Sequence, residues 1–281
     1  MKKVTVIVII FSFVMISACG HTQTPTAEVN VAQVKAVTLD PHDAAWDDVS
    51  LHVSKLLLQD LVDPRLMEPS TADVQVKAIT DGTQIAFRLE WTDETQNDLQ
   101  GPKHFIDGCA VQLPAKIDPN VPAPQMGEVG KTVEIAFWRA DWQAIVEGRA
   151  DNIQSIYPNA TVDHYPSEAK PLENNPQALS EAAARYAPAR ALGNRRAGPR
   201  DQPVEDMIAE GPGTLSPAPN AVSKGKGVKT KTGWAVVISR PMPAGFSSAT
   251  PSQIAFAVWE AAHGEVGARK MRTGWVPLIL K

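Results

Sequence analysis

The chain has 281 residues, 43% of them hydrophobic and 21% charged, a composition that fits a globular protein with a substantial core and excludes a disordered chain. A formal net charge of −4 provides no basic surface for phosphate backbones, so no nucleic-acid partner is expected. Two cysteines, Cys19 and Cys109, exclude a disulfide scaffold, a four-thiolate zinc site and a cysteine-ligated iron–sulfur cluster, and neither lies in the C-x-x-C-H sequence of c-type haem attachment.

The first twenty residues predict an export signal. Two lysines precede an apolar run over residues 4–16, which is too short to span a bilayer and has the length of a signal-peptide core. The run ends in the sequence ISACG, which resembles a bacterial lipoprotein signal and implies cleavage before Cys19 and acylation of its sulfur. The alternative is an ordinary signal peptide with an incidental cysteine.

This signal predicts three parts of the chain. We expect a signal peptide over residues 1–18, a lipidated tether over residues 19–30 and one folded domain over residues 31–281. The domain would lie on the extracytoplasmic, periplasmic side and would be attached to a membrane only through its lipid. Lipidation of Cys19 would leave Cys109 without an intramolecular partner.

Alternation of apolar and polar residues predicts a mainly β protein. Strands are expected over residues 74–80, 84–91, 110–113, 132–138, 234–239, 253–259 and 275–280, with a hairpin turn at Asp81-Gly82. Short helices are expected over residues 141–147, 180–186 and 203–210, and the glycine run 224–227 is interpreted as a turn. The spacing of strands, without regular crossover helices, favours an antiparallel two-sheet β-sandwich.

One region departs from this pattern. Residues 157–228 carry ten prolines and predict a long, loop-rich insertion that lies over the surface of the sandwich. Structureless loops of this length are uncommon in compact domains unless they bind something.

The motifs of hydrolytic and metal catalysis are missing. No Gly-x-Ser-x-Gly sequence is present, and the six histidines have no metal-ligand spacing, with His104 the best placed for a function. Seven tryptophans leave a second interpretation open, in which Trp46, Trp91 or Trp142 stacks on sugars in a carbohydrate-binding sandwich on a surface lipoprotein.

Several blocks of sequence, taken in order, resemble a known family. They are Ala45-Trp46, residues 74–93, residues 105–114, Pro124-Gln125-Met126-Gly127, residues 133–141, residues 204–211 with 213–215, residues 234–241, and residues 254–260 with Gly264-Glu265, Lys270 and Trp275. Their order and spacing resemble the haem b-binding gamma subunits of periplasmic molybdoenzymes of the dimethyl sulfoxide reductase superfamily. Those enzymes include ethylbenzene dehydrogenase, dimethyl sulfide dehydrogenase, selenate reductase, chlorate reductase and nitrite oxidoreductase.

The resemblance implies one non-covalent haem b with two axial ligands. The methionine of the family's Met-Gly loop corresponds to Met126, and the lysine after the Phe-Ala-Val-Trp strand corresponds to Lys270. A thioether is a soft, neutral ligand that raises the reduction potential, whereas lysine ligates only as a neutral amine. Arg269 beside the lysine leaves a shift of one or two residues open; Lys224, Lys226, Lys229 and Lys231 are the competing amines, and Met271 is the competing thioether.

The resemblance also implies a function and partners. It implies a non-catalytic subunit that relays single electrons between an iron–sulfur subunit and an external carrier, a soluble cytochrome c or a quinone-linked protein. The catalytic molybdopterin subunit would be a separate chain. A haem protein that works without molybdenum partners is a further alternative. Where the family has Asp-Gly and Arg around the lysine loop, this chain has Glu260-Ala261 and Val266.

Overall fold

The structure of the protein is a computed structural model that describes residues 24–60, 63, 65–150, 152–161, 174–186, 188–189, 192, 194, 196 and 198–281. The expected signal peptide and the predicted acylation site Cys19 lie outside these residues, so both stay predictions. No helix in the described part of the chain is long and apolar enough to span a bilayer.

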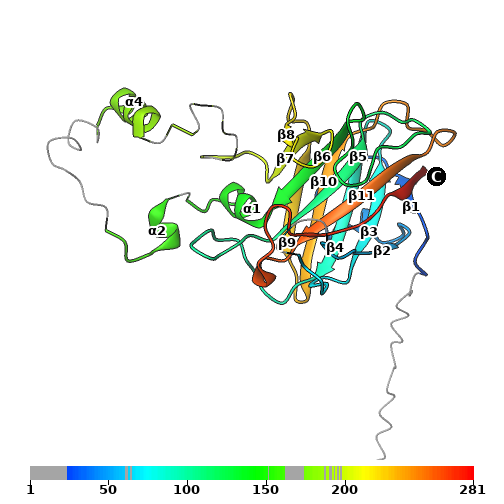
Figure 1. Cartoon of the computed structure of the whole chain (residues 1–281), viewed down its shortest axis with the longest axis horizontal. Helices are drawn as coiled ribbons and strands as arrows, with labels where there is room; N and C mark the ends of the chain where they lie inside the picture. The colour runs from blue at the N-terminus through cyan, green and yellow to red at the C-terminus, as the bar shows by residue number, and fades with distance from the viewer. Residues whose placement is uncertain are drawn as a thin grey trace, which may run out of the picture.

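The described chain is mainly β, which confirms the predicted class (Figure 1). The helical elements are η1 (Ala44–Trp46), α1 (Ala140–Val146), α2 (Ile153–Ile156), α4 (Pro176–Tyr186) and η2 (Ala261–His263). The strands are β1 (Val29–Gln33), β2 (His52–Lys55), β3 (Asp73–Thr80), β4 (Gln84–Thr92), β5 (Gly108–Pro114), β6 (Val133–Arg139), β7 (Val204–Ala209), β8 (Ser216–Pro217), β9 (Lys224–Lys229), β10 (Gly233–Pro241), β11 (Ser252–Trp259), β12 (Met271–Arg272) and β13 (Val276–Leu280).

The strands form two layers that share strand β11. We call β8-β7-β6-β5-β11, with β12 on β11, the first layer, and β13-β1-β3-β4-β10-β9, with β2 on β3, the second layer. Residues 252–254 of β11 pair with β13, and residues 255–259 pair with β5, so hydrogen bonding runs continuously from one layer into the other. The expectation of purely antiparallel pairing is wrong at β1, which pairs in parallel with both β13 and β3.

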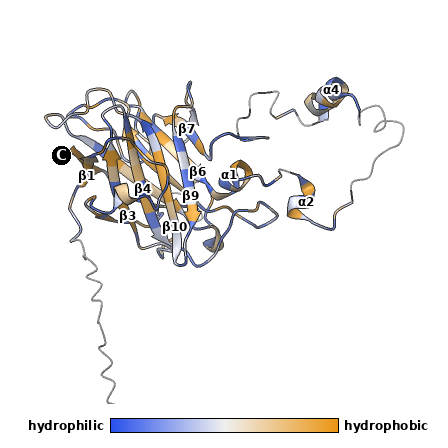
Figure 2. Cartoon of the chain, turned by 180° about the vertical axis from the view of Figure 1, so that it is seen from behind, coloured by the Kyte–Doolittle hydropathy of each residue, from blue (hydrophilic) through white to orange (hydrophobic). Residues whose placement is uncertain are grey.

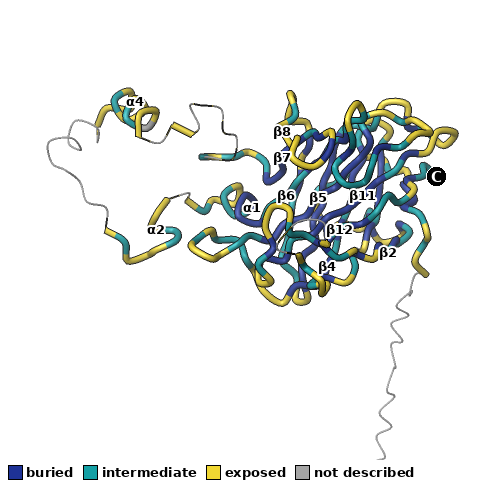
Figure 3. The backbone as a smooth tube through the Cα atoms, in the orientation of Figure 1, coloured by how far each residue is buried: buried dark blue, intermediate teal, exposed yellow. Residues whose placement is uncertain are grey.

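The core lies between the two layers and centres on Trp138 of β6. Its indole makes edge contacts with Trp91 of β4 and Trp234 of β10, at centroid distances of 6.4 and 5.1 Å. In Figure 3 the strands of both layers are largely buried, and in Figure 2 hydrophobic residues recur along them. Cys109 is a free, fully buried thiol in this core, and burial raises its pKa, so it is an inert packing residue.

The glycine run predicted as a turn is strand β9. A Cβ on Gly227 would lie 2.2 Å from Cζ2 of Trp138, so the alternating glycines give the indole room to pack against β9. The lysines that alternate with these glycines point to the opposite face of the strand. The glycines thus allow the two layers to pack closely at this point. The local sequence does not reveal this contact, because Trp138 is distant in the chain.

The expected helices have mixed outcomes. The predictions over residues 141–147 and 180–186 are confirmed by α1 and α4, but residues 204–209 form strand β7 instead of a helix. Pairing with β6 along the whole of β7 outweighs the local helical preference of this segment. The insertion prediction is therefore wrong where β7, β8 and β9 occur, and α2 and α4 lie beside the sandwich, not over its faces (Figure 1).

Candidate functional site

A cavity of about 990 Å³ lies on the face of the first layer that points away from the core. This volume is at the upper end of the range for small-molecule and cofactor sites. The floor consists of residues from β5, β6, β7 and β11, and loops 122–127 and 264–270 form walls. The floor and wall residues include Ala110, Gln112, Met126, Ile135, Phe137, Met207, Ala255, Ala257, Trp259 and Lys270.

Strand register places small side chains on the floor. Ala257 of β11 lies opposite Ala110 of β5, and Ala255 lies opposite Gln112, so three of these four paired residues are alanines. Larger apolar side chains border it, with Phe137 opposite Ala110 and Trp259 at the end of β11. A recessed, apolar strip between aromatic walls suits a planar, largely apolar ligand.

The loop that carries Met126 is held in an uncommon backbone conformation. Met126 has φ of 68° and Gly127 has φ of 81°, two successive left-handed residues. The carbonyl of Met126 accepts a 2.8 Å hydrogen bond from the Gly211 amide, and Gln112 Nε2 donates to the Pro124 carbonyl at 3.0 Å. These bonds tie the loop to the segment that follows β7 and to the floor, and they hold Met126 at the cavity wall.

Gly127 is essential to this loop because it has no side chain. A Cβ there would lie 2.8 Å from the Lys131 carbonyl oxygen and 3.0 Å from that of Ala209. We expect Gly127→Ala to lower the free energy of unfolding by about 1–3 kcal/mol, measured by denaturant titration. Gly130→Ala is the matched control, since Gly130 has φ of 78° but nothing within 4 Å of its Cβ position. Equal losses in the two variants would contradict the steric argument.

Lys270 projects into the cavity without an anionic partner. Its Nζ lies 5.4 Å from the Trp259 ring centroid and makes no hydrogen bond or ion pair with the described residues. Burial, reinforced by the positive charge of Arg272, lowers the pKa of this amine. Trp259 donates from Nε1 to the Gly267 carbonyl at 3.0 Å, which fixes the loop that carries the lysine. The site thus shifts the equilibrium of Lys270 towards the neutral amine.

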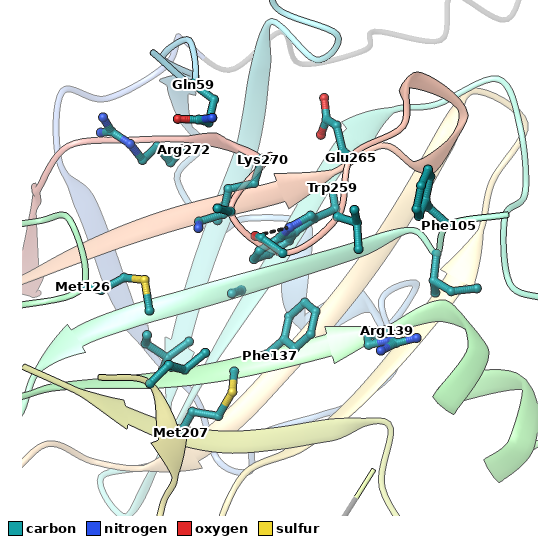
Figure 4. A pocket seen from close by; sticks show the side chains of 18 of the residues that line it. Gln59, Phe105, Met126, Phe137, Arg139, Met207, Trp259, Glu265, Lys270 and Arg272 are labelled. Carbon is teal, nitrogen blue, oxygen red and sulfur yellow. Dashed lines mark hydrogen bonds between the residues drawn. The ribbon is translucent and has the colours of Figure 1, made fainter. Parts of the chain in front are cut away.

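The predicted pair, Met126 and Lys270, lines one cavity, and Figure 4 shows both side chains on its walls. The competing residues lie elsewhere. Met271 is fully buried in the core on the other face of β12, and Arg269 packs over Phe105 instead of lining the cavity. The lysines at positions 224, 226, 229 and 231 are also absent from its lining.

Two further residues line the cavity: a second methionine, and the histidine that the sequence analysis placed best for a function. Met207 of β7 lines the cavity, and Arg196 Nη2 lies 3.3 Å from its sulfur. Met207 was not a candidate in the sequence analysis, because residues 203–210 were expected to form a helix. His104 also lines the cavity, where its backbone amide donates to the Gly101 carbonyl at 3.0 Å.

Asp107 joins the start of β5 to three neighbouring segments. Its carboxylate accepts hydrogen bonds from the amides of Asn97 and Ala261, at 2.7 and 3.0 Å, and from Trp234 Nε1 at 3.1 Å. Burial raises its pKa to about 6 despite these donors, and the nearby charge of Asp93 adds to the increase.

This raised pKa predicts a pH-dependent stability. Between pH 4 and 6 the folded protein holds a proton on Asp107 that the unfolded chain has lost, so this group contributes less stability as the pH rises. We expect Asp107→Asn to make the slope of the unfolding free energy over this range less negative, by at most about 1.4 kcal/mol per pH unit. Denaturant unfolding at several pH values measures it, and an unchanged slope would contradict the assignment.

Fold and site together define a mainly β protein with a largely apolar cavity that is flanked by a thioether and by an amine without an anionic partner among the described residues. The family described as ethylbenzene dehydrogenase matches residues 43–271, so the chain belongs to this family, as the resemblance predicted.

Two relatives carry informative names. A protein of Haloferax mediterranei, named as a respiratory nitrate reductase heme subunit, is 20% identical over 98% of this chain and 82% of its own length. The chlorate reductase subunit gamma of Ideonella dechloratans is 23% identical over 70% of this chain. The matched part spans 59% of that relative's length.

The solved structures that resemble the chain are distant. A carbohydrate binding module of family 9 from Caldicellulosiruptor kristjanssonii, in complex with glucose, matches with a TM-score of 0.46 and 10% identity over 90% of this chain and 95% of that one. A match at this level carries no functional argument. The three tryptophans considered for sugar stacking, Trp46, Trp91 and Trp142, are at most 4% exposed, so none presents a stacking face to solvent.

Proposed function

We propose that this chain is the electron-transfer haem subunit of an oxidoreductase complex and holds one haem b in the cavity described above. The observation that carries the proposal is that Met126 and Lys270, from loops far apart in the sequence, line the same apolar cavity. The relatives named as a heme subunit and a gamma subunit of nitrate and chlorate reductases support it.

The cavity fits a porphyrin in three respects. Its volume of about 990 Å³ is large enough for a cofactor, three alanines contribute small side chains to its floor, and aromatic side chains border it. The unpaired amine of Lys270 would otherwise be a poorly compensated positive charge among apolar groups. In its neutral form the amine would donate its lone pair to a haem iron, a partner that the described residues do not offer.

The two side chains divide the ligand chemistry between them. The sulfur of Met126 needs no deprotonation, and the burial that lowers the pKa of Lys270 favours the neutral amine that can donate a lone pair. Haem iron held by two protein ligands has no open position and supplies single-electron oxidation and reduction. The chain would therefore transfer electrons and leave substrate chemistry to another subunit.

Absorption spectroscopy tests the cofactor. The purified full-length chain, titrated with ferric haem, is expected to bind one equivalent and to develop a Soret band. A product that stays colourless after reconstitution would reject the proposal.

We further propose that the chain works with a molybdopterin catalytic subunit and an iron–sulfur subunit, and passes electrons to or from a cytochrome c or quinone-linked carrier. Co-expression with those subunits, followed by affinity purification through this chain, is expected to recover all three. Recovery of haem-loaded chain alone would instead favour a haem protein without molybdenum partners.

The site of action is also a proposal. The lipoprotein-type signal supports an extracytoplasmic position with membrane attachment through lipidated Cys19. Mass spectrometry of the mature chain tests this, because acylation at Cys19 adds diacylglycerol to its first residue. An unmodified mature N-terminus would reject the anchor.

A further inference from the structure

Arg272 presents a guanidinium to the same cavity. It lies opposite Ala257 in the β11–β12 ladder, so both side chains project from one face of the sheet, and Ala257 is part of the cavity floor. Its neighbour Met271 lies opposite Val258 and points into the core. The Arg272 carbonyl accepts a 2.7 Å hydrogen bond from the Leu57 amide. This bond holds the edge of β12 that does not pair with β11.

Arg272 differs from the other arginines that line the cavity in its lack of an acidic partner. Arg139 makes two hydrogen bonds to Asp141, at 2.9 and 2.7 Å, and Arg196 is paired with Glu205 at 2.7 Å. The guanidinium of Arg272 has no ion pair or hydrogen bond with any residue that the structure describes. Among the described residues nothing compensates its charge at the cavity wall, so an anionic group on a ligand in the cavity would be a favourable partner.

The position of Arg272 relative to Lys270 indicates where that anion lies. The two residues are separated by one position at the start of β12, so they share a face and lie about 7 Å apart along the chain. Figure 4 shows Arg272 beside Gln59, at the side of the cavity beyond Lys270. A planar ligand centred on the amine would extend its edge towards the guanidinium.

We propose that Arg272 binds a carboxylate on the edge of the tetrapyrrole, a propionate group of the haem. This inference rests on the proposed function and adds the polar contact that orients the cofactor. A guanidinium matches a carboxylate with two parallel N–H donors, a geometry that selects one edge of the macrocycle over the others. Lys270 would act as a neutral ligand and Arg272 as a permanent cation, two roles that their side-chain chemistry suits.

The experiment compares haem with its dimethyl ester, which lacks both carboxylate charges. The full-length wild type is expected to bind haem about 10- to 100-fold more tightly than the ester, the effect of a charge-assisted hydrogen bond. In Arg272→Gln this preference is expected to fall towards onefold while ester affinity changes little. Arg269→Gln, which removes a cation from the same loop outside the cavity, should retain the wild-type preference.

The outcomes separate this inference from the proposed function. Failure of wild type to bind either compound rejects the haem site altogether. Binding of both by wild type with equal affinity rejects the carboxylate contact and leaves the haem site intact, and this readout does not depend on any variant folding. An equal loss of preference in Arg272→Gln and Arg269→Gln would overturn the assignment to Arg272, because it would show only a general effect of charge.

Discussion

Lys270→Ala is expected to remove one axial ligand and to open the iron of the reconstituted protein to water. The change replaces the only cavity-lining lysine among the described residues. Haem affinity should fall by at least about tenfold, the scale observed when even an outer partner of a metal ligand is removed. The ferric spectrum should change from six-coordinate low-spin to high-spin, and added imidazole should bind.

The control is Lys226→Ala, which removes a competing amine on β9, outside the cavity. This variant should keep the wild-type spectrum and affinity. A wild-type spectrum in Lys270→Ala, or a high-spin spectrum in Lys226→Ala, would contradict the ligand assignment. Thermal unfolding of the haem-free variants shows whether either substitution acts through the fold.

Met126→Leu is expected to lower the reduction potential by on the order of 100 mV, because a thioether ligand raises it and leucine offers no donor. Leucine and methionine have similar volumes, so the apolar wall is retained and the sulfur alone is tested. Spectroelectrochemical titration of the reconstituted protein measures the potential, and the ferrous absorption bands report the loss of sulfur.

Met207→Leu is the matched control for this experiment. Met207 also lines the cavity, but its sulfur already lies 3.3 Å from the Arg196 guanidinium, and it sits in a strand, not in the Met-Gly loop. Its replacement should change the potential much less. A larger shift in Met207→Leu than in Met126→Leu would transfer the thioether role to β7.

The fold was predictable wherever alternation was strong and local. The segments that became β3, β4, β5, β6, β10, β11 and β13 were all expected, because apolar residues at every second position serve a strand with one face in the core. The strands β7 and β9 were not expected. Both depend on partners that are distant in the chain. Strand β7 pairs with β6, and the glycines of β9 make room for Trp138.

The sequence by itself determined the family and, through the resemblance, predicted Met126 and Lys270 as the ligand pair. The resemblance implied that they meet at one haem, but their loops come together at one cavity only through the pairing of β5, β6, β7 and β11. Tertiary structure also decided the alanines on the cavity floor, the presence of Met207 at the site and the lack of an acidic partner for Arg272 among the described residues. Local sequence sets the conformation of a strand, but cross-strand register, which results from long-range pairing, sets which side chains share a face.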